Sequence, residues 1–268
     1  MNEIHLEKVA CIYLGKAQEA YMQACEKIKE AATSKVLDLS DMELFDIPQE
    51  LFELENLENL NLDENKLAYI PDEIGKLKNL RHLSIRGNCI MNLPESIGLL
   101  ENLEKLYLGY NTISELPDSI CNLQNLKMLN MANNLLTTLP KNIGNLKSLV
   151  KLSLHDNLLE SLPSSIGNLK NLKKIFLDNN NLSTIPASFV NLSCLEELVV
   201  SGNELKTLPP EFCFIRLKEL ILDENKLETL PASLAKCTSL RLIAINGNPI
   251  ESIPQELLGC MNLTIDGN

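Results

Sequence analysis

A unit of 23 residues recurs along most of the 268-residue chain, and this repeat limits the folds that the sequence can adopt. From Leu57, the unit reads Leu-x-x-Leu-x-Leu-x-x-Asn-x-Leu-x-x-Ile-Pro. The same frame restarts, in steps of 23 residues except for one step of 22, at Leu80, Leu103, Leu126, Leu149, Leu172, Leu195, Leu217 and Leu240. A single unit cannot bury its own leucines, so neighbouring units must stack into a solenoid with one continuous core.

Two other columns of the repeat predict how each coil turns. Ten of the 12 prolines share one column, namely Pro48, Pro71, Pro94, Pro117, Pro140, Pro163, Pro186, Pro209, Pro231 and Pro254. Proline fixes φ and needs no ladder donor, so we expect an irregular segment or a single helical turn after it, on the convex side. Nine units carry Asn in the ninth column, from Asn65 to Asn248, and only Met42 departs. Because an amide both donates and accepts, stacked asparagines should satisfy backbone groups where each coil leaves its strand.

The repeat divides the chain into three parts. Residues 34–262 hold ten units, of which the first is degenerate, and residues 263–268 begin a truncated one. We expect one short parallel strand per coil, which at about 4.8 Å per strand gives an inner sheet of roughly 48 Å. The truncated end either folds over the tenth coil or continues in a longer native chain.

Residues 1–33 lie outside the repeat and show helical spacing. Apolar residues recur at three- and four-residue steps, namely Ile4, Val9, Ile12, Tyr13, Ala17, Ala20, Tyr21, Ala24, Ile28 and Ala31. This pattern predicts an amphipathic helix that caps the open apolar edge of the first coil, with a partner-binding helix as the alternative. Gly15 is expected to break it into two helices.

The unit, with its Leu-Pro and Ile-Gly pairs, resembles a family of intracellular 23-residue leucine-rich repeats. Members include Ras-suppressor and Shoc-type scaffolds, plant intracellular Ras-group proteins and bacterial effectors. The segment from Ile28 to Asp41 is similar to the approach to the first repeat in bacterial and Roc-type members. The resemblance implies an α/β solenoid, a leucine-rich-repeat horseshoe with a concave parallel β-sheet and an N-terminal helical cap. It also implies protein–protein recognition on the concave face.

Charge and composition exclude several other classes of function. The net charge of −12 disfavours duplex nucleic acid, which needs clustered cations. The sequence has no apolar run of membrane-spanning length, and its first residues lack the order of a signal peptide. The eight cysteines are dispersed, which predicts reduced and mostly buried thiols in a cytoplasmic monomer.

No catalytic motif is visible in the repeat region. The phosphate loop GxxxxGK[ST], HExxH and GxSxG do not occur. We therefore expect no enzyme activity, no cofactor and no metal site.

Strand alternation indicates which residues face a partner. The predicted central column of the concave face reads Asp38, Asn61, Ser84, Tyr107, Asn130, Ser153, Phe176, Val199, Ile221 and Ala244. Two candidate binding clusters lie on or beside it. We call the first the aromatic cluster, and it comprises His82, Arg86, Tyr107, Tyr110 and Met128. We call the second the apolar ladder, and it comprises Phe176, Val199 and Ile221. Aromatic and arginine side chains often anchor interfaces, and contiguous exposed apolar side chains often mark them, although such residues also simply suit strands.

Charged residues are biased to opposite sides of the predicted groove. Before the strands lie Arg81, Lys105, Lys127, Lys151, Lys173 and Lys174, interrupted by Glu58, Glu104, Glu196 and Glu197. After the strands lie Asp41, Asp63, Glu64, Asp156, Asp178, Asp223 and Glu224. This bias favours either two oppositely charged banks or a mixed solvated surface. His155 also faces the groove, roughly 14 Å from His82, too far to share a metal ion, so we interpret it as a polar contact residue.

The leading hypothesis is a non-catalytic adaptor that binds a protein on its concave face. A bacterial effector that is delivered into a host cell is the second hypothesis, for which the excess of Lys over Arg and the abundant Asn are only suggestive. A regulatory or targeting subunit of an enzyme is the third.

Overall fold

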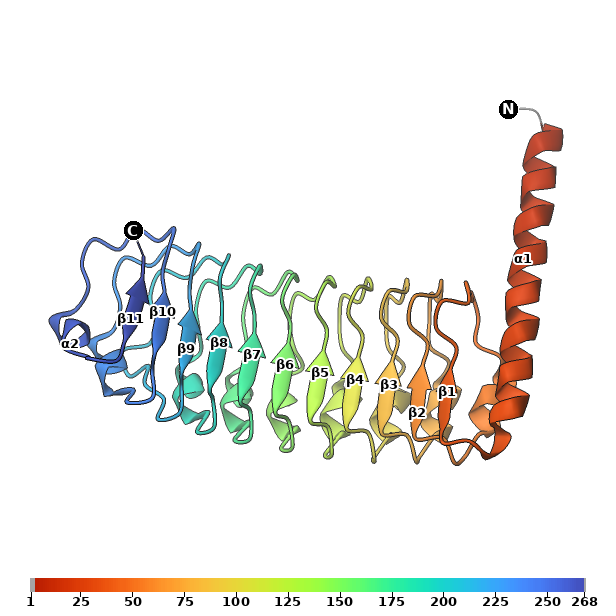
Figure 1. Cartoon of the computed structure of the whole chain (residues 1–268), viewed down its shortest axis with the longest axis horizontal. Coiled ribbons are helices and arrows are strands. Elements are labelled where there is room, and N and C mark those ends of the chain that lie inside the picture. The colour runs from red at the N-terminus through yellow and green to blue at the C-terminus, as the bar shows by residue number, and fades with distance from the viewer. Residues whose placement is uncertain (1–2, 268) are drawn as a thin grey trace.

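Eleven short parallel strands form one sheet along the whole solenoid. The computed structural model describes residues 3 to 267, with side chains from residue 15 onward. The strands pair in chain order (Figure 1), and they are β1 Val36–Asp38, β2 Asn59–Asn61, β3 His82–Ser84, β4 Lys105–Tyr107, β5 Met128–Asn130, β6 Lys151–Ser153, β7 Lys174–Phe176, β8 Glu197–Val199, β9 Glu219–Ile221, β10 Leu242–Ala244 and β11 Thr264–Asp266. The middle residue of each strand through β10 points into the core, which the stacked leucines and isoleucines fill. The predicted horseshoe with a concave parallel sheet is therefore confirmed.

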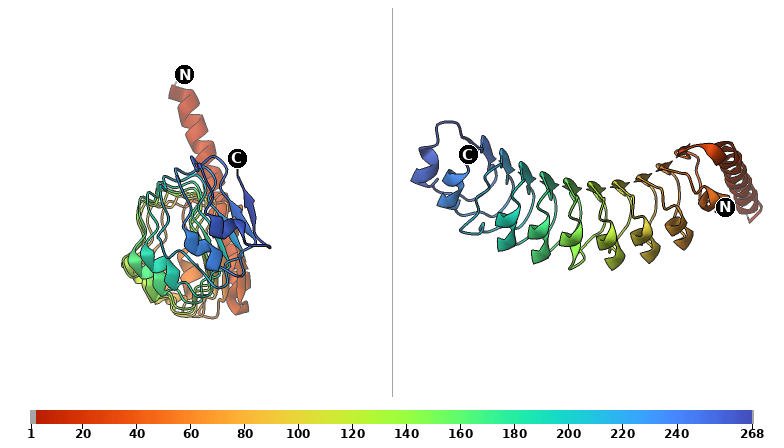
Figure 2. Two further views of the ribbon diagram at one scale, coloured as in Figure 1. Left: turned by 90° about the vertical axis from the view of Figure 1, so that its left-hand side faces the viewer. Right: turned by 90° about the horizontal axis from the view of Figure 1, so that it is seen from below.

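Short 3₁₀ helices form the convex side, as Figure 2 shows. Those of the repeats are η2 Gln49–Glu53, η3 Asp72–Lys76, η4 Glu95–Leu99, η5 Asp118–Asn122, η6 Ile143–Asn145, η7 Ser164–Asn168, η8 Ala187–Asn191 and η9 Ala232–Lys236, and α2 Gln255–Leu258 takes this place in the tenth unit. In most units the column proline directly precedes the turn, and its carbonyl oxygen accepts the first hydrogen bond, as from Ile97 N to Pro94 O at 3.0 Å. The expected helical turn after proline is confirmed.

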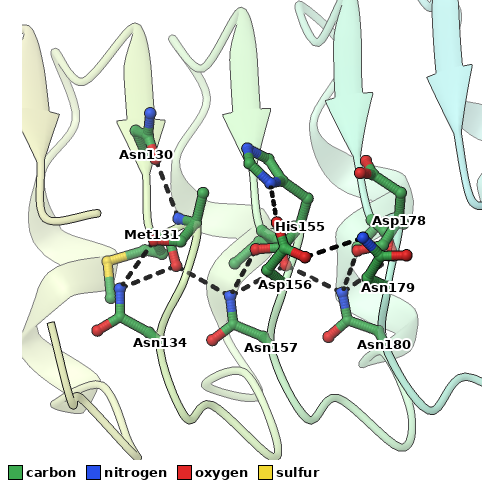
Figure 3. Close-up of polar contacts among 12 residues, drawn as sticks. Asn130, Met131, Asn134, His155, Asp156, Asn157, Asp178, Asn179 and Asn180 are labelled. Carbon is green, nitrogen blue, oxygen red and sulfur yellow. Dashed lines mark hydrogen bonds and ion pairs between the residues drawn. The ribbon is translucent and has the colours of Figure 1, made fainter. Parts of the chain in front are cut away.

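The column of asparagines forms a buried ladder at the end of the strands (Figure 3). Asn157 is representative: its Nδ2 donates to the carbonyls of Met131 at 2.9 Å, Leu154 at 3.0 Å and His155 at 3.2 Å. Its Oδ1 accepts from the backbone N–H of Leu136 at 3.0 Å. The amide thus joins its own coil to the preceding one, as the sequence predicts.

One helix caps the first coil. Helix α1 spans Glu3–Glu30 and leads through η1 (Ala31–Thr33) into β1. Its last two turns bury Ala20, Ala24 and Ile28, at the predicted spacing, against the first coil, whereas its N-terminal part projects beyond the solenoid (Figure 1). The predicted apolar positions before Gly15 lie outside the residues whose side chains are described.

One expectation about the N-terminal part is corrected. Gly15 does not divide the helix, because an interior glycine costs only about 1 kcal/mol relative to alanine and the residues around it are good helix formers.

Residues 263–267 lie against the tenth coil. Thr264–Asp266 add strand β11 to the edge of the sheet, with Ile265 opposite Ile243, and Leu263 and Ile265 pack against the core.

Candidate functional site

The concave face displays the first and third residues of every strand, because alternate side chains leave a strand on the same side. The third residues form the predicted central column, and the strand register joins them into one ladder: Tyr107 lies opposite Asn130, and Phe176 opposite Val199. Within the column, Ser153 and Ala244 are buried between larger neighbours. The geometry of this column is as predicted. The partner-binding role of its side chains stays a prediction.

The aromatic cluster separates into two contacts. The Tyr107 hydroxyl donates to the Met128 sulfur at 3.7 Å, across neighbouring strands. Tyr107 also lines an open hollow of about 400 Å³ over β1 to β4, together with His82, Lys105 and Asp38. Partial burial and the nearby Lys105 ammonium lower the pKa of His82, which favours the neutral imidazole. The hollow therefore offers hydrogen-bonding groups beside one half-buried ring.

Tyr110 lies at the rim of the groove in an unusual backbone conformation. Its side chain is 55 % exposed, and the Arg86 guanidinium lies 5.5 Å from its ring centroid. Its φ is +57°. The same column of the repeat is left-handed in every coil, at Asp41, Glu64, Gly87, Tyr110, Asn133, Asp156, Asn179, Gly202, Glu224 and Gly247. Left-handed backbone costs a bulky residue about 1–2 kcal/mol, and only Gly, Asn and Asp adopt it readily, so the scaffold gains nothing from a tyrosine here.

Replacing Tyr110 with asparagine is expected to leave the free energy of unfolding unchanged or to raise it by up to about 1 kcal/mol, because asparagine tolerates positive φ. The reverse change one coil later, Asn133→Tyr, is expected to lower it by about 1 kcal/mol. Urea denaturation followed by circular dichroism measures both. If Tyr110→Asn instead costs more than about 1 kcal/mol, the ring with its Arg86 contact supports the fold and is not free for a partner.

The apolar ladder runs across β7 to β9. The register places Phe176 against Val199 and Val199 against Ile221, and each side chain is half-buried by its neighbours. The Lys151 ammonium lies 5.1 Å from the centre of the Phe176 ring. The ladder is therefore a continuous apolar strip with a mobile cationic side chain over one end.

His155 belongs to a different network from His82. Its Nδ1 lies 2.8 Å from the Asp156 carboxylate, which also accepts from Asn179 Nδ2 at 2.8 Å (Figure 3). These hydrogen bonds, the one from His155 first, lower the pKa of Asp156. His155 thus contacts residues that follow the strands. It lies three strands away from His82 in the sheet. Among the described residues, no group of three or more His, Cys, Asp or Glu is placed to hold a metal ion.

Most of the cations before the strands are paired, which favours a mixed solvated surface over a basic bank on this side of the groove. Along the edge before the strands, charges alternate in sign from coil to coil: Lys35 lies 2.6 Å from Glu58, Arg81 bonds Glu104 at 3.0 Å, and Lys127 bonds Glu104 at 2.7 Å. Three further pairs along the sheet are Lys173 with Glu196, Lys174 with Glu197 and Lys218 with Glu196. In the part of the chain whose side chains are described, only Lys105 and Lys151 of the proposed bank form no ion pair.

Sequence reasoning missed several large exposed apolar side chains on the flank that follows the asparagine turn. They are Phe45, Tyr69, Met91, Leu135 and Leu158. The signal was present in the sequence, since the columns that hold them carry polar residues in most other coils, beside the buried Leu and Ile columns of the same stretch.

Three family profiles match the chain, all of the same repeat. A leucine-rich repeat region matches residues 72–161 and 118–204, and further leucine-rich repeat profiles match residues 35–90 and 194–215. The chain is a leucine-rich repeat protein. No curated protein sequence matches it.

Solved structures of leucine-rich repeat proteins show the same fold. A leucine-rich repeat protein of Leptospira interrogans is 29 % identical at a TM-score of 0.68, over 91 % of this chain and 81 % of that one. The plant peptide hormone receptor RGFR1, solved in complex with RGF2, is 30 % identical at a TM-score of 0.67, over 82 % of this chain. PEPR1, solved with AtPEP1, is 31 % identical at a TM-score of 0.77, over 87 % of this chain. This chain covers only 41 % of the RGFR1 chain and 35 % of the PEPR1 chain.

The cysteines of this leucine-rich repeat protein are less buried than expected. The seven whose side chains are described carry free thiols, of which Cys121 and Cys237 are buried, and Cys89 is exposed. Burial raises the pKa of Cys121 to about 11 and that of Cys237 to about 12, so both stay protonated. The remaining four, Cys25, Cys194, Cys213 and Cys260, are partly buried. Within residues 3–267, no helix has the length and apolarity that crossing a membrane requires.

Proposed function

We propose that this protein is a non-catalytic adaptor of the 23-residue intracellular type, and that it binds a protein partner on its concave face. The observation that carries the proposal is Tyr110. It holds an exposed ring at the groove rim in a backbone conformation that suits Gly or Asn better. Strain that the fold does not need is often retained for binding. Exposed aromatic and arginine side chains, such as Tyr110 and Arg86, are also the commonest interface anchors.

Two further features support this proposal. The residue type in the central column varies from coil to coil, whereas the core columns keep Leu or a similar residue. Side chains of the central column can therefore be specific for a partner without destabilising the fold. RGFR1 and PEPR1, which share this fold, were solved with RGF2 and AtPEP1, respectively. In support of the intracellular type, Ile-Gly pairs recur at Gly75, Gly98, Gly144 and Gly167, each followed by a leucine two residues after the glycine.

The proposal is tested by comparing partner capture between three forms of the protein. A triple variant, Tyr107→Ala with Tyr110→Ala and Phe176→Ala, is expected to lose at least about tenfold in affinity for the natural partner, since hot-spot aromatics each contribute over 1 kcal/mol. The matched control, Leu99→Ala with Ile215→Ala, removes exposed apolar side chains away from the groove. Cross-linking with quantitative mass spectrometry identifies the proteins that wild type and control retain and the triple variant loses.

Thermal melting of all three forms separates binding from folding. We expect the melting temperature of the triple variant to stay within a few degrees of wild type, because its three side chains are exposed or half-buried. Equal capture of the same proteins by the triple variant and by wild type would show that the concave face is not the binding surface.

The location and assembly of the protein are proposals of the same kind. We place it in the cytoplasm as a monomer, with support from the exposed free thiol of Cys89, since oxidising compartments favour disulfides. Delivery into a host cell and service as an enzyme-targeting subunit stay predictions. A translocation reporter tests the first, and enzymatic activity that co-purifies with the protein tests the second.

A further inference from the structure

The apolar ladder lies between two rims of carboxylates. The first residues of β8 and β9, Glu197 and Glu219, lie side by side along one rim in the strand register. Two residues beyond the ladder positions, Asp178 and Asp223 form the other rim, since residues at that spacing share a face. Phe176, Val199 and Ile221 run between the rims. The apolar floor of coils seven to nine therefore has two carboxylates on each side, while Lys174 of coil seven and Ser201 of coil eight complete the two rims.

These carboxylates are only partly compensated within the chain. Glu197 pairs with Lys174 at 2.7 Å, and Asp223 accepts from the backbone N–H of Asn246 at 2.7 Å. Glu219 and Asp178 form no ion pair with any residue whose side chain is described. Burial raises the pKa of Asp178, which means that its carboxylate would gain from a cation placed beside it.

The rest of the concave face has a different charge. In the same column as Glu197 and Glu219, the preceding strands carry Lys105, Lys151 and Lys174. The sign in this column therefore changes between β7 and β8, and only β8 and β9 carry Glu there among the described strands. The column of Asp178 and Asp223 holds one further acid, Asp63 in the second coil, where the first residue of the strand is the neutral Asn59. Such a coincidence of apolar and charged features gives a surface a preferred partner and a preferred direction.

We propose that the apolar ladder and its acidic rims bind an extended protein segment in which apolar side chains alternate with Lys or Arg. This assignment rests on the proposed function and specifies its partner. The apolar side chains of the segment cover Phe176, Val199 and Ile221, and its cations reach Glu219 and Asp178. An acidic segment is rejected, because it would bring like charges together at both rims.

Labelled peptides of defined composition test the proposal. The first probe is a peptide of about ten residues in which Leu alternates with Lys, long enough at ~3.3 Å per residue to cross the three coils. Two matched peptides replace Lys with Glu, or Leu with Ser. Fluorescence anisotropy with wild type is expected to give at least about tenfold tighter binding for the Leu/Lys peptide than for either control.

Two charge reversals in the same coil distinguish the effect of a rim carboxylate on binding from the effect of the net charge of the protein. Glu219→Lys is expected to weaken the Leu/Lys peptide about tenfold, because it reverses an unpaired rim charge. Glu228→Lys makes the same change in net charge on the exposed flank, and it is expected to stay within about twofold of wild type. Ile221→Ser is expected to weaken binding comparably by removing part of the apolar floor. Circular dichroism confirms that each variant is folded.

Four other results of the binding experiments would each contradict the proposed segment, for a different reason. Equal loss from Glu219→Lys and Glu228→Lys assigns binding to net charge alone. Tight binding of the Leu/Glu peptide that Ile221→Ser weakens refutes the acidic rims and leaves the proposed concave binding intact. Failure of all three peptides removes this class of partner, while the capture experiment still decides the proposed function. A dimer seen by light scattering that Ile221→Ser dissociates assigns the ladder to a second copy of the chain.

Discussion

Replacing Asn157 with alanine is expected to lower the free energy of unfolding by about 1–3 kcal/mol, although its side chain lies outside the proposed binding surface. Its Oδ1 is the acceptor for the buried N–H of Leu136, which has no other acceptor among the described residues. Its Nδ2 donates to the carbonyls of Met131 and Leu154, which also accept from the amides of Asn134 and Asn180, respectively. Alanine therefore leaves the Leu136 N–H without an acceptor between the stacked coils, while both carbonyls keep a donor.

A surface asparagine of the preceding coil gives the control. Asn145 is exposed in η6, and its side chain forms no hydrogen bond with a described residue, so Asn145→Ala is expected to change stability by less than about 0.5 kcal/mol. Asn157→Asp keeps the acceptor for Leu136 but places a carboxylate against backbone carbonyls, so we expect it to cost at least as much as alanine. Urea denaturation measures all three variants. A cost for Asn157→Ala below about 1 kcal/mol would mean that the backbone finds other partners.

The parts of the fold that the sequence predicts are those in which one physical need recurs in every coil. The buried middle positions of the strands need Leu or Ile. Where a coil leaves its strand, the backbone needs an amide partner such as Asn157. The convex turn follows a proline such as Pro94. Nine or ten copies of each requirement make the pattern visible against the background of individual residues. The central column was predictable for the same reason, since alternation along each strand leaves only one position between two buried ones.

Features that depend on contact between neighbouring coils were not predictable in this way. The alternation of Lys35, Glu58, Arg81, Glu104 and Lys127 looks like a basic bank with interruptions until the strand register places each charge beside its opposite. These ion pairs join residues 23 positions apart, so the pattern within a single repeat does not reveal them. The side of the groove before the strands is therefore a largely paired edge. The role of the carboxylates that follow the strands stays a prediction.

The backbone conformation of individual residues was also not predictable from the sequence. The positive φ of Tyr110 is hidden in the sequence, because its column also holds acidic and amide residues and shows glycine only at Gly87, Gly202 and Gly247. Aromatic residues were also less specific for the groove than expected. Phe52, Phe189, Phe212 and Phe214 are all in the core, and the last two pack edge to face at 4.8 Å in the unit that lacks one residue.

The same Gly→Ala change is expected to have opposite effects at two positions. Gly144 lies in η6, where an added Cβ would fall far inside van der Waals contact with the carbonyl oxygen of Ser165 in the next coil. Because that oxygen belongs to the backbone of a stacked turn, it cannot move without shifting the coil, and we expect Gly144→Ala to lower the free energy of unfolding by about 3 kcal/mol. Gly15 in α1 has no atom within 4 Å of an added Cβ, so Gly15→Ala is expected to raise helix stability by up to about 1 kcal/mol.

The pair of variants tests whether the coils stack as closely as the structure shows. Glycine and serine face each other at the neighbouring steps as well, where Gly98 meets Ser119 and Gly167 meets Ser188. If close stacking is a shared requirement, Gly167→Ala must cost about as much as Gly144→Ala, and Gly15→Ala must not. Urea denaturation of the three variants decides this, and a loss below about 1 kcal/mol at both Gly144 and Gly167 would mean that the convex turns separate readily. The curvature of the groove, and with it the spacing of any partner contacts, would then be adjustable.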